Sequence, residues 1–398
     1  MLKYWVWLAE LRISNLFRLA LLRHFGTPEN VYFADEGEIL LTEGVTKEQA
    51  EHLRDHDLRI ADRILADCQR LDQRILTIQD AEYPSRLKNI YDPPFLLYTK
   101  GRLPAIDEEA VIAVVGTRSC TAYGEKHALQ MGYGITSGGG IVVSGLAKGV
   151  DALATRGALN AGGVTLGVVG GGLDVQYPWE NRGLYEDVAA VGALLSEYPP
   201  GTRHEGWHFP IRNRILSGLA VGTLVVEAPG VSGALITANT ALEQGRDVFA
   251  IPGPIDGAAS VGCNRLIQDS AAALVTEPWD VLREYADRFP EKLRPEAVRE
   301  APDAPGYRAR QERRAAVKKE PPRPVFPAFR LADSGLTDDQ MALLRVLPAE
   351  EPALADDLIE TTGIPTRRVL SALTVLEISG LVRQHSGKRY TRTVTPEE

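Results

Sequence analysis

Four short segments of this chain are rich in glycine, and three of them also hold basic or hydroxyl side chains, a combination suited to binding phosphate. They are residues 116–118, 144–149, 170–172 and 230–233. Glycine lets backbone amides approach an anion closely, and a helix that begins after such a loop adds a favourable dipole. Arg118 and Lys148 supply positive charge, and Ser144 and Ser232 supply hydroxyl donors. Glycine also serves ordinary tight turns, so one loop is weak evidence, whereas four on one edge of a sheet indicate a phosphate-rich ligand.

A fifth basic segment places two arginines around an amide, close to aromatic rings. Arg212 and Arg214 flank Asn213, and Phe209 lies three positions before Arg212. Arginine pairs with phosphate oxygens in a fork geometry, and Phe209 or Trp207 can stack on a base. The alternative is that either arginine forms a structural ion pair with one of the many acidic residues.

The sequence lacks the fingerprints of common cofactor and metal sites. No Gly-x-Gly-x-x-Gly follows the first expected strand, and no Gly-x4-Gly-Lys-Ser/Thr occurs. Residues 204–208 match His-Glu-x-x-His, but Gly206 and Pro210 oppose the helix that would bring both histidines to one zinc ion. The three cysteines are widely spaced and odd in number, which excludes a disulfide framework. We therefore expect no catalytic residue, no cofactor and no metal.

The glycine-rich segments follow short apolar runs that predict the strands of a parallel sheet. These runs are residues 111–115, 141–143, 164–169, 194–196, 223–226 and 248–251, each rich in aliphatic residues and several in β-branched ones. Helix-like segments separate them, which is typical of a doubly wound α/β fold. Ligands of such sheets bind beyond the carboxyl ends of the strands, where the glycine-rich loops would meet.

Helical periodicity predicts further domains on both sides of this sheet. Residues 1–74 are expected to form an all-α domain similar to SAM or helix-hairpin-helix domains, with Thr46 and Gln49 as a capping box. Residues 75–290 would form the sheet domain, and residues 291–333 a basic, proline-rich linker. Residues 334–398 predict a winged helix, with helices near 338–347, 354–361 and 366–379 before a hairpin.

The motifs of residues 80–275 resemble those of the DNA processing protein A family, also called DprA or Smf. The resemblance rests on Tyr83-Pro84, on 93–98, 114–118, 144–151, 177–178 and 209–214, and on 232–237, 245–246 and 251–253. It implies an extended Rossmann-like domain that binds single-stranded DNA, often dimerises and loads the RecA recombinase onto incoming strands. The resemblance places the DNA pocket around Arg118, Ser144, Gly145, Lys148, Arg212, Asn213, Arg214 and Gly233.

The charge distribution restricts where DNA can lie. The net charge is -9, and only residues 291–330 hold more basic than acidic side chains. A phosphate-binding surface elsewhere must be a local patch on an acidic body. No apolar run is long enough for a membrane span, so we expect a cytoplasmic protein.

Three functional hypotheses follow. The favoured one is a non-enzymatic protein that binds and protects single-stranded DNA, forms a homodimer and delivers the strand to RecA in natural transformation. The second is a nucleotide-binding enzyme or nucleotide N-glycosidic hydrolase, because residues 229–234 approximate the loop of such enzymes. In the third, the winged helix reads duplex DNA through Thr366, Arg367 and Arg368. The nearby acidic residues Asp356, Asp357 and Glu360 favour a protein-interaction role or a weak accessory DNA role for that domain instead.

Overall fold

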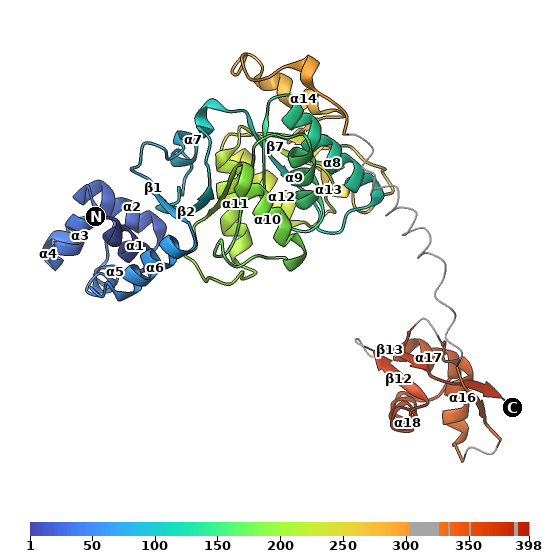
Figure 1. The fold of residues 1–398 in the computed structure, drawn as a ribbon. Coiled ribbons are helices and arrows are strands. Elements are labelled where there is room, and N and C mark those ends of the chain that lie inside the picture. Colours follow the sequence, from blue (N-terminus) through green and yellow to red (C-terminus); the bar gives the residue numbers. More distant parts are fainter. Residues whose placement is uncertain (302–325, 333–334, 350–351, 386–388, 398) are drawn as a thin grey trace. The chain divides into compact units, whose positions relative to one another are not determined.

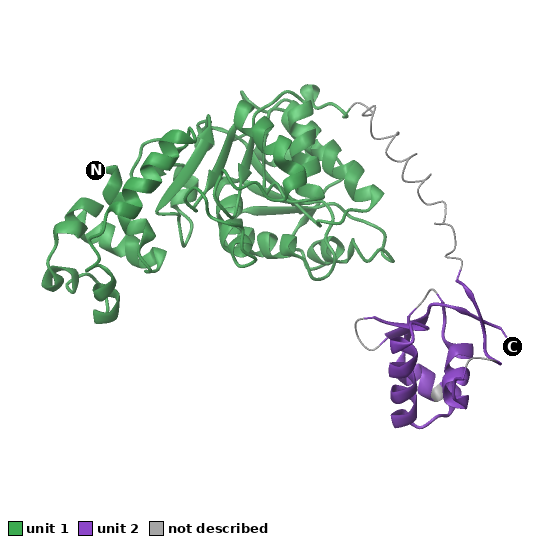
Figure 2. Ribbon diagram, turned by 60° about the horizontal axis from the view of Figure 1, so that its bottom comes forward, with its two compact units in different colours: residues 1–302 green, residues 303–398 purple. Residues whose placement is uncertain are grey.

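The computed structural model describes residues 1–301, 326–332, 335–349, 352–385 and 389–397. The chain forms two compact units, residues 1–302 and residues 303–398 (Figure 2). No helix among the described residues has the length and apolar character needed to cross a membrane. The two units are described separately below.

A nine-stranded sheet forms the centre of the first unit (Figure 1). The strands are β1 Arg74–Thr77, β2 Leu96–Gly101, β3 Val111–Val115, β4 Ile141–Ser144, β5 Thr165–Val168, β6 Ala193–Ser196, β7 Gly222–Val225, β8 Asp247–Ala250 and β9 Ala273–Leu274. Their order is β1-β2-β6-β5-β4-β3-β7-β8-β9, and pairing is parallel from β6 to β9. Strands β2 and β1 extend the sheet in antiparallel pairing. The predicted strands and the doubly wound fold class are confirmed, with ends that differ by one residue.

Strands β3 and β7 lie side by side although the chain visits β4, β5 and β6 between them. The chain therefore builds the sheet first in one direction from β3 and then in the other. The loops after β3 and β7 diverge toward opposite faces of the sheet at this point, leaving a crevice at the carboxyl edge. The order of the strands thus creates the place where a ligand would bind.

Helices cover both faces of the sheet because its central strands are apolar on both sides. Val111, Ala113 and Val115 of β3 belong to one core, and Ile112 and Val114 belong to a second core. The first core includes residues of α10 Arg182–Val191, α11 His208–Leu219, α12 Gly233–Glu243 and α13 Val261–Gln268. The second includes residues of α8 Ala122–Ser137, α9 Val150–Asn160 and α14 Pro278–Leu282.

Six helices precede the sheet and pack against its antiparallel edge (Figure 1). They are α1 Leu2–Glu10, α2 Asn15–Phe25, α3 Pro28–Phe33, α4 Glu36–Ile39, α5 Lys47–His52 and α6 Arg59–Arg70. The predicted capping box is present, because Thr46 accepts from the amide of Gln49, which accepts in turn from the amide of Thr46. Trp5 packs on Phe95, with 4.7 Å between ring centroids, so these helices share a core with the sheet.

The second unit has the predicted winged-helix architecture. Helices α16 Asp338–Val346, α17 Ala355–Thr362 and α18 Thr366–Ile378 pack around a separate core. Strand β11 Ala353–Leu354 pairs with β13 Arg389–Arg392, which pairs with β12 Val382–His385. Strand β10 Ala328–Arg330 pairs with β14 Thr395–Glu397. The predicted tip of the hairpin, residues 386–388, lies outside the described residues.

The predicted linker, residues 291–333, is described only at its two ends. The amide of Arg299 donates to Ser137 Oγ, and Lys292 Nζ lies 2.5 Å from Glu109 Oε1, so residues 292–299 still contact the first unit. At the other end, Phe329 packs against the core of the second unit. Residues 302–325 lie outside the described residues.

Candidate nucleic-acid interface

A groove of about 710 Å³ lies at the carboxyl edge of the sheet, where the loops after β3 and β7 separate. Three segments form most of its lining: residues 115–118 after β3, residues 204–216 at the start of α11, and residues 229–237 at the start of α12. Five of the predicted positions line it, namely Arg118, Phe209, Arg212, Asn213 and Gly233. The sequence thus identified the three chain segments that converge there.

Arg118 and Phe209 form the contact that connects two of these segments. The Arg118 guanidinium carbon lies 4.9 Å from the centre of the Phe209 ring. Tyr177 and His204 add two more rings, with centroids 6.1 Å and 6.3 Å from that of Phe209. The guanidinium can pair with a phosphate, and the rings beside it offer flat surfaces on which bases can stack.

The groove continues into a narrow recess toward the loop after β4. Gly145, Lys148 and Gly170 line this recess, together with Arg118 and Phe209. The side chain of Lys148 is exposed, and its Nζ lies 2.6 Å from a carboxylate oxygen of Glu180. An exposed ion pair of this kind contributes little to stability, so Lys148 can exchange its partner for a phosphate at small cost.

Arg212 is buried beneath the groove rather than projecting from it. Its Nη1 donates to the carbonyl of Val168 at 2.7 Å, and its guanidinium lies against Gly145. Burial lowers the pKa of Arg212 and raises that of Asp151, and the opposite charge of the other group works against both shifts. Arg212 therefore connects α11 to the end of β5, and its charge favours the ionised form of the buried Asp151 at the start of α9.

Gly145 and Ser144 form the same buried layer. A Cβ on Gly145 would collide with the Arg212 guanidinium, so a larger residue here would displace that side chain. The Gly145 amide donates to Asp151 Oδ2 at 3.1 Å. The hydroxyl of Ser144 is fully buried and donates to the carbonyl of Val114, within the sheet. Ser144 thus joins β4 to β3, and its hydroxyl does not line the groove.

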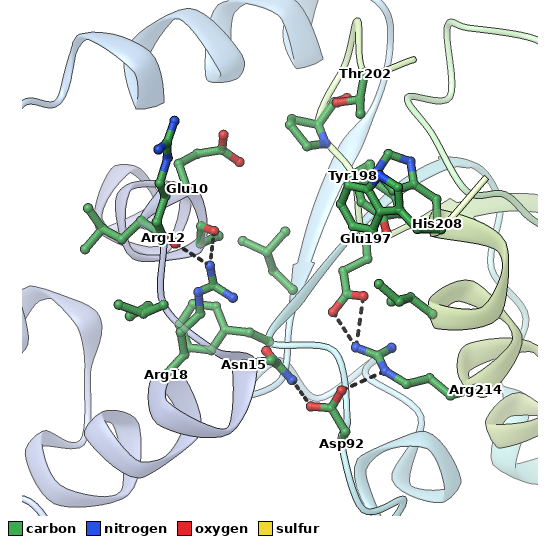
Figure 3. Close-up of a pocket in the computed structure, with 18 residues that line it drawn as sticks. Glu10, Arg12, Asn15, Arg18, Asp92, Glu197, Tyr198, Thr202, His208 and Arg214 are labelled. Atoms are coloured by element: carbon green, nitrogen blue, oxygen red, sulfur yellow. Dashed lines mark hydrogen bonds and ion pairs between the residues drawn. The ribbon is translucent and has the colours of Figure 1, made fainter. Parts of the chain in front are cut away.

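Arg214 points into a different cavity, on the other side of α11. Its Nε lies 2.9 Å from Asp92 Oδ2, and its Nη2 lies 2.7 Å from Glu197 Oε1. Asn15 of α2 donates to the other oxygen of Asp92, so Asp92 bridges the N-terminal helices and α11 (Figure 3). Of the nine predicted site positions, the groove and its recess bring together seven, and Ser144 and Arg214 lie elsewhere.

The loops of the groove are tied together by a carboxylate. Glu227 is buried, and its side chain accepts from the hydroxyl of Thr121 at 2.6 Å and from the Thr121 amide at 2.9 Å. The carbonyl of Glu227 accepts from the Thr117 amide. A Cβ on Gly124 would lie 2.2 Å from the Glu227 carboxylate, so glycine permits this contact. These bonds fix the loop after β3 against the end of β7.

The two histidines of the His-Glu-x-x-His segment each bond to a backbone carbonyl. His204 Nε2 lies 2.7 Å from the Val175 carbonyl oxygen, and His208 Nδ1 lies 2.8 Å from that of Gly170. Helix α11 begins only at His208, so the histidines do not share a helical face. Within the described residues, no group of three or more potential metal ligands is assembled.

Comparisons with known proteins agree with this geometry. The family described as DNA recombination-mediator protein A matches residues 74–286, and its DprA winged-helix domain matches residues 327–388. Protein Smf of Synechocystis is 33% identical over 400 residues, which cover 98% of each chain. This chain belongs to the DprA/Smf family.

Two further members of the family show where the similarity is concentrated. DNA processing protein DprA of Streptococcus pneumoniae is 47% identical over 209 residues, which cover 52% of this chain and 73% of that protein. A crystal structure of DprA from Streptococcus pneumoniae superimposes with a TM-score of 0.63 and 36% identity, covering 71% of this chain and 98% of that chain.

Some residues of the groove were not assigned a role from the DprA/Smf motifs. Tyr177 stands in one of those motifs, but only the structure places its ring beside Phe209. Asp151 also stands in a motif, and its contact with Gly145 depends on the turn after β4. Glu227 carries no sequence signal, because its role depends on the adjacency of β3 and β7.

Proposed function

We propose that this chain binds single-stranded DNA in the groove at the carboxyl edge of the sheet. The observation that carries the proposal is the placement of Arg118 over Phe209, next to Tyr177 and His204. Arg118 offers a guanidinium to the phosphates, and the rings offer surfaces on which unpaired bases stack. A duplex keeps its bases stacked on each other, so these rings favour a single strand.

The electrostatic character of the chain supports a localised contact. The net charge is -9, while Arg118 and Lys148 stand exposed on the groove and its recess. Phosphates would be attracted to this patch and repelled by much of the remaining surface. A strand held at few phosphates should dissociate readily with salt, with a slope of about -0.7 per neutralised phosphate.

The proposal extends to delivery of the strand to a recombinase. The family description, DNA recombination-mediator protein, supports a role in which the chain protects incoming DNA and loads RecA during natural transformation. A homodimer would present two grooves and so hold a strand more firmly than one groove. Mixing RecA with DNA that carries this protein should shorten the lag of RecA filament formation.

We also propose that the groove performs no chemistry. Two carboxylates at its loops are already engaged: Asp151 accepts from the Gly145 amide, and Glu227 accepts twice from Thr121. Because hydrogen bonds already occupy these two carboxylates, neither is free to act as a general acid or base. Release of free base from nucleoside monophosphates would instead favour the hydrolase hypothesis and overturn this part of the proposal.

The decisive experiment compares labelled oligo-dT with a duplex of equal length in a titration of the full chain. We expect tight binding of oligo-dT that weakens with salt, and much weaker binding of the duplex. The double substitution Arg118→Ala with Lys148→Ala should weaken oligo-dT binding. Arg156→Ala serves as a matched control, since Arg156 forms a similar exposed ion pair, with Asp187. Equal affinity for both probes would contradict single-strand binding.

A further inference from the structure

A second cavity lies between the N-terminal helices and the sheet, separated from the groove by the start of α11 (Figure 3). Its volume is about 720 Å³, within the range of sites that hold nucleotide-sized ligands. The end of α1 and the start of α2 line one side, with Glu10, Arg12 and Arg18. The segment after β6 and the first turns of α11 line the other side.

Three aromatic rings in contact form one wall of this cleft. Tyr198 lies on His208 with 4.0 Å between ring centroids and 25° between ring planes. Trp207 contacts the same imidazole edge-on, also at 4.0 Å, and the indole remains 62% exposed. His208 is itself fixed by its bond to the Gly170 carbonyl. The cleft therefore presents an open aromatic side chain on a rigid support.

The polar groups of the cleft carry both signs of charge. Arg214 forms ion pairs with both Asp92 and Glu197 at the base of the cleft. Arg18 donates to the carbonyls of Leu8, Ala9 and Leu11, which holds its guanidinium at the wall. Three carboxylates and three guanidiniums line the cleft, so it offers no excess of positive charge to a polyphosphate, and it is too polar for a purely apolar molecule. A flat neutral ring with donors and acceptors on its edge fits both the charges and the indole.

We propose that this cleft is a second nucleobase site, which binds a base stacked on Trp207. Carboxylates accept hydrogen bonds from the amino and imino groups of bases, and guanidiniums donate to their carbonyl oxygens and ring nitrogens. The base can come from the strand held in the groove or from a free nucleotide. Binding of a base from the strand rests on the proposed function, whereas binding of a free nucleotide does not.

The path between the two cavities is short. Gly206 and Phe209 line the groove, whereas Trp207 and His208 line the cleft, so the two cavities share a rim at the first turn of α11. A strand leaving Phe209 would reach Trp207 without crossing another element. Arg203 is exposed on this segment and can form ion pairs with the phosphates of such a strand.

The experiment uses the full chain and a series of oligo-dT lengths. Trp207→Ala should leave the affinity for the shortest bound oligomer unchanged and should weaken longer oligomers by about tenfold, the usual effect of losing one stacked base. Trp207→Phe should restore most of that loss. Phe33→Ala is the matched control, because Phe33 is a similarly exposed ring, 70% accessible, on the N-terminal helices. Titration of the protein with dTMP or dGMP, followed by tryptophan fluorescence, tests whether the base of a free nucleotide occupies the cleft.

Each outcome decides a separate point. Length-dependent loss in Trp207→Ala supports a base supplied by the strand. Fluorescence quenching by a mononucleotide that disappears in Trp207→Phe supports a free nucleotide. If the wild-type protein binds oligo-dT but Trp207→Ala changes neither readout, the inference is wrong and the groove proposal stands. If the wild-type protein binds no oligo-dT, the groove proposal is wrong, and the mononucleotide titration alone decides the cleft.

Discussion

The guanidinium of Arg118 lies over the ring of Phe209, which brings the loop after β3 against the first turn of α11. Arg118 is exposed, and its guanidinium contacts the Phe209 ring at the surface of the groove. We therefore expect Arg118→Ala to keep the melting temperature and to weaken oligo-dT binding by about tenfold at moderate salt. The salt slope should decrease by about 0.7, the contribution of one phosphate. An unchanged slope would mean that Arg118 touches no phosphate.

Phe209 contributes stacking rather than charge. Phe209→Leu keeps an apolar side chain of similar size but removes the flat ring. The expected loss is about 1 kcal/mol of binding free energy with no change in salt slope, since base stacking is insensitive to salt. Fluorescence anisotropy of labelled oligo-dT at two salt concentrations separates this result from that of Arg118→Ala. A change in slope would assign Phe209 an indirect effect on phosphate contacts.

Arg212 should behave as a residue of the folded core. Arg212→Ala removes the bond to the Val168 carbonyl and the positive charge that favours the ionised form of the buried Asp151, which we expect to cost about 3 kcal/mol of unfolding free energy. The combined variant Arg212→Met with Asp151→Asn removes both charges and should recover much of that stability. Urea unfolding of the three proteins measures this. Normal stability in Arg212→Ala would contradict the buried pairing.

Arg214 provides a test of the sequence-based site assignment. The side chain is only 13% exposed and lies between Asp92 and Glu197, outside the groove. Arg214→Ala should lower the unfolding free energy by about 2 kcal/mol, because two partly buried carboxylates lose their cation. At a temperature where the variant is fully folded, its affinity for the shortest bound oligo-dT, which occupies the groove alone, should match that of the wild type. Loss of affinity in the folded protein would restore Arg214 to the DNA site.

The second unit is expected to bind duplex DNA weakly. Arg368 at the start of α18 pairs with Asp339, with 2.7 Å between Nη2 and Oδ1. The exposed side chains farther along α18 include Leu370, Val375 and Ile378, which suit a protein surface better than a DNA groove. A chain ending at residue 302 should therefore keep the oligo-dT affinity and the duplex affinity of the full chain within about twofold. A large loss of duplex binding would assign the recognition role to α18.

The sheet was predictable because its strands carry a local signal, whereas the layout of the site depends on contacts between distant segments. Runs such as Val111–Val115 are apolar at every position, which only a strand buried on both faces requires. Arg212 and Arg214 looked like one basic element in the sequence. In α11 they lie two residues apart, and residues at that spacing face different directions. One arginine therefore lies under the groove, and the other lies in the cleft.

The bonds that Glu227 and Asp151 make to the loops have a consequence for how fast DNA can be exchanged. These loops are already ordered by buried hydrogen bonds before any ligand arrives. Association then costs little conformational entropy on the protein side, so a small number of contacts can suffice for useful affinity. The small number of contacts also makes dissociation of the DNA fast, because few interactions must break. A preorganised groove of this kind is suited to holding a strand briefly and handing it on.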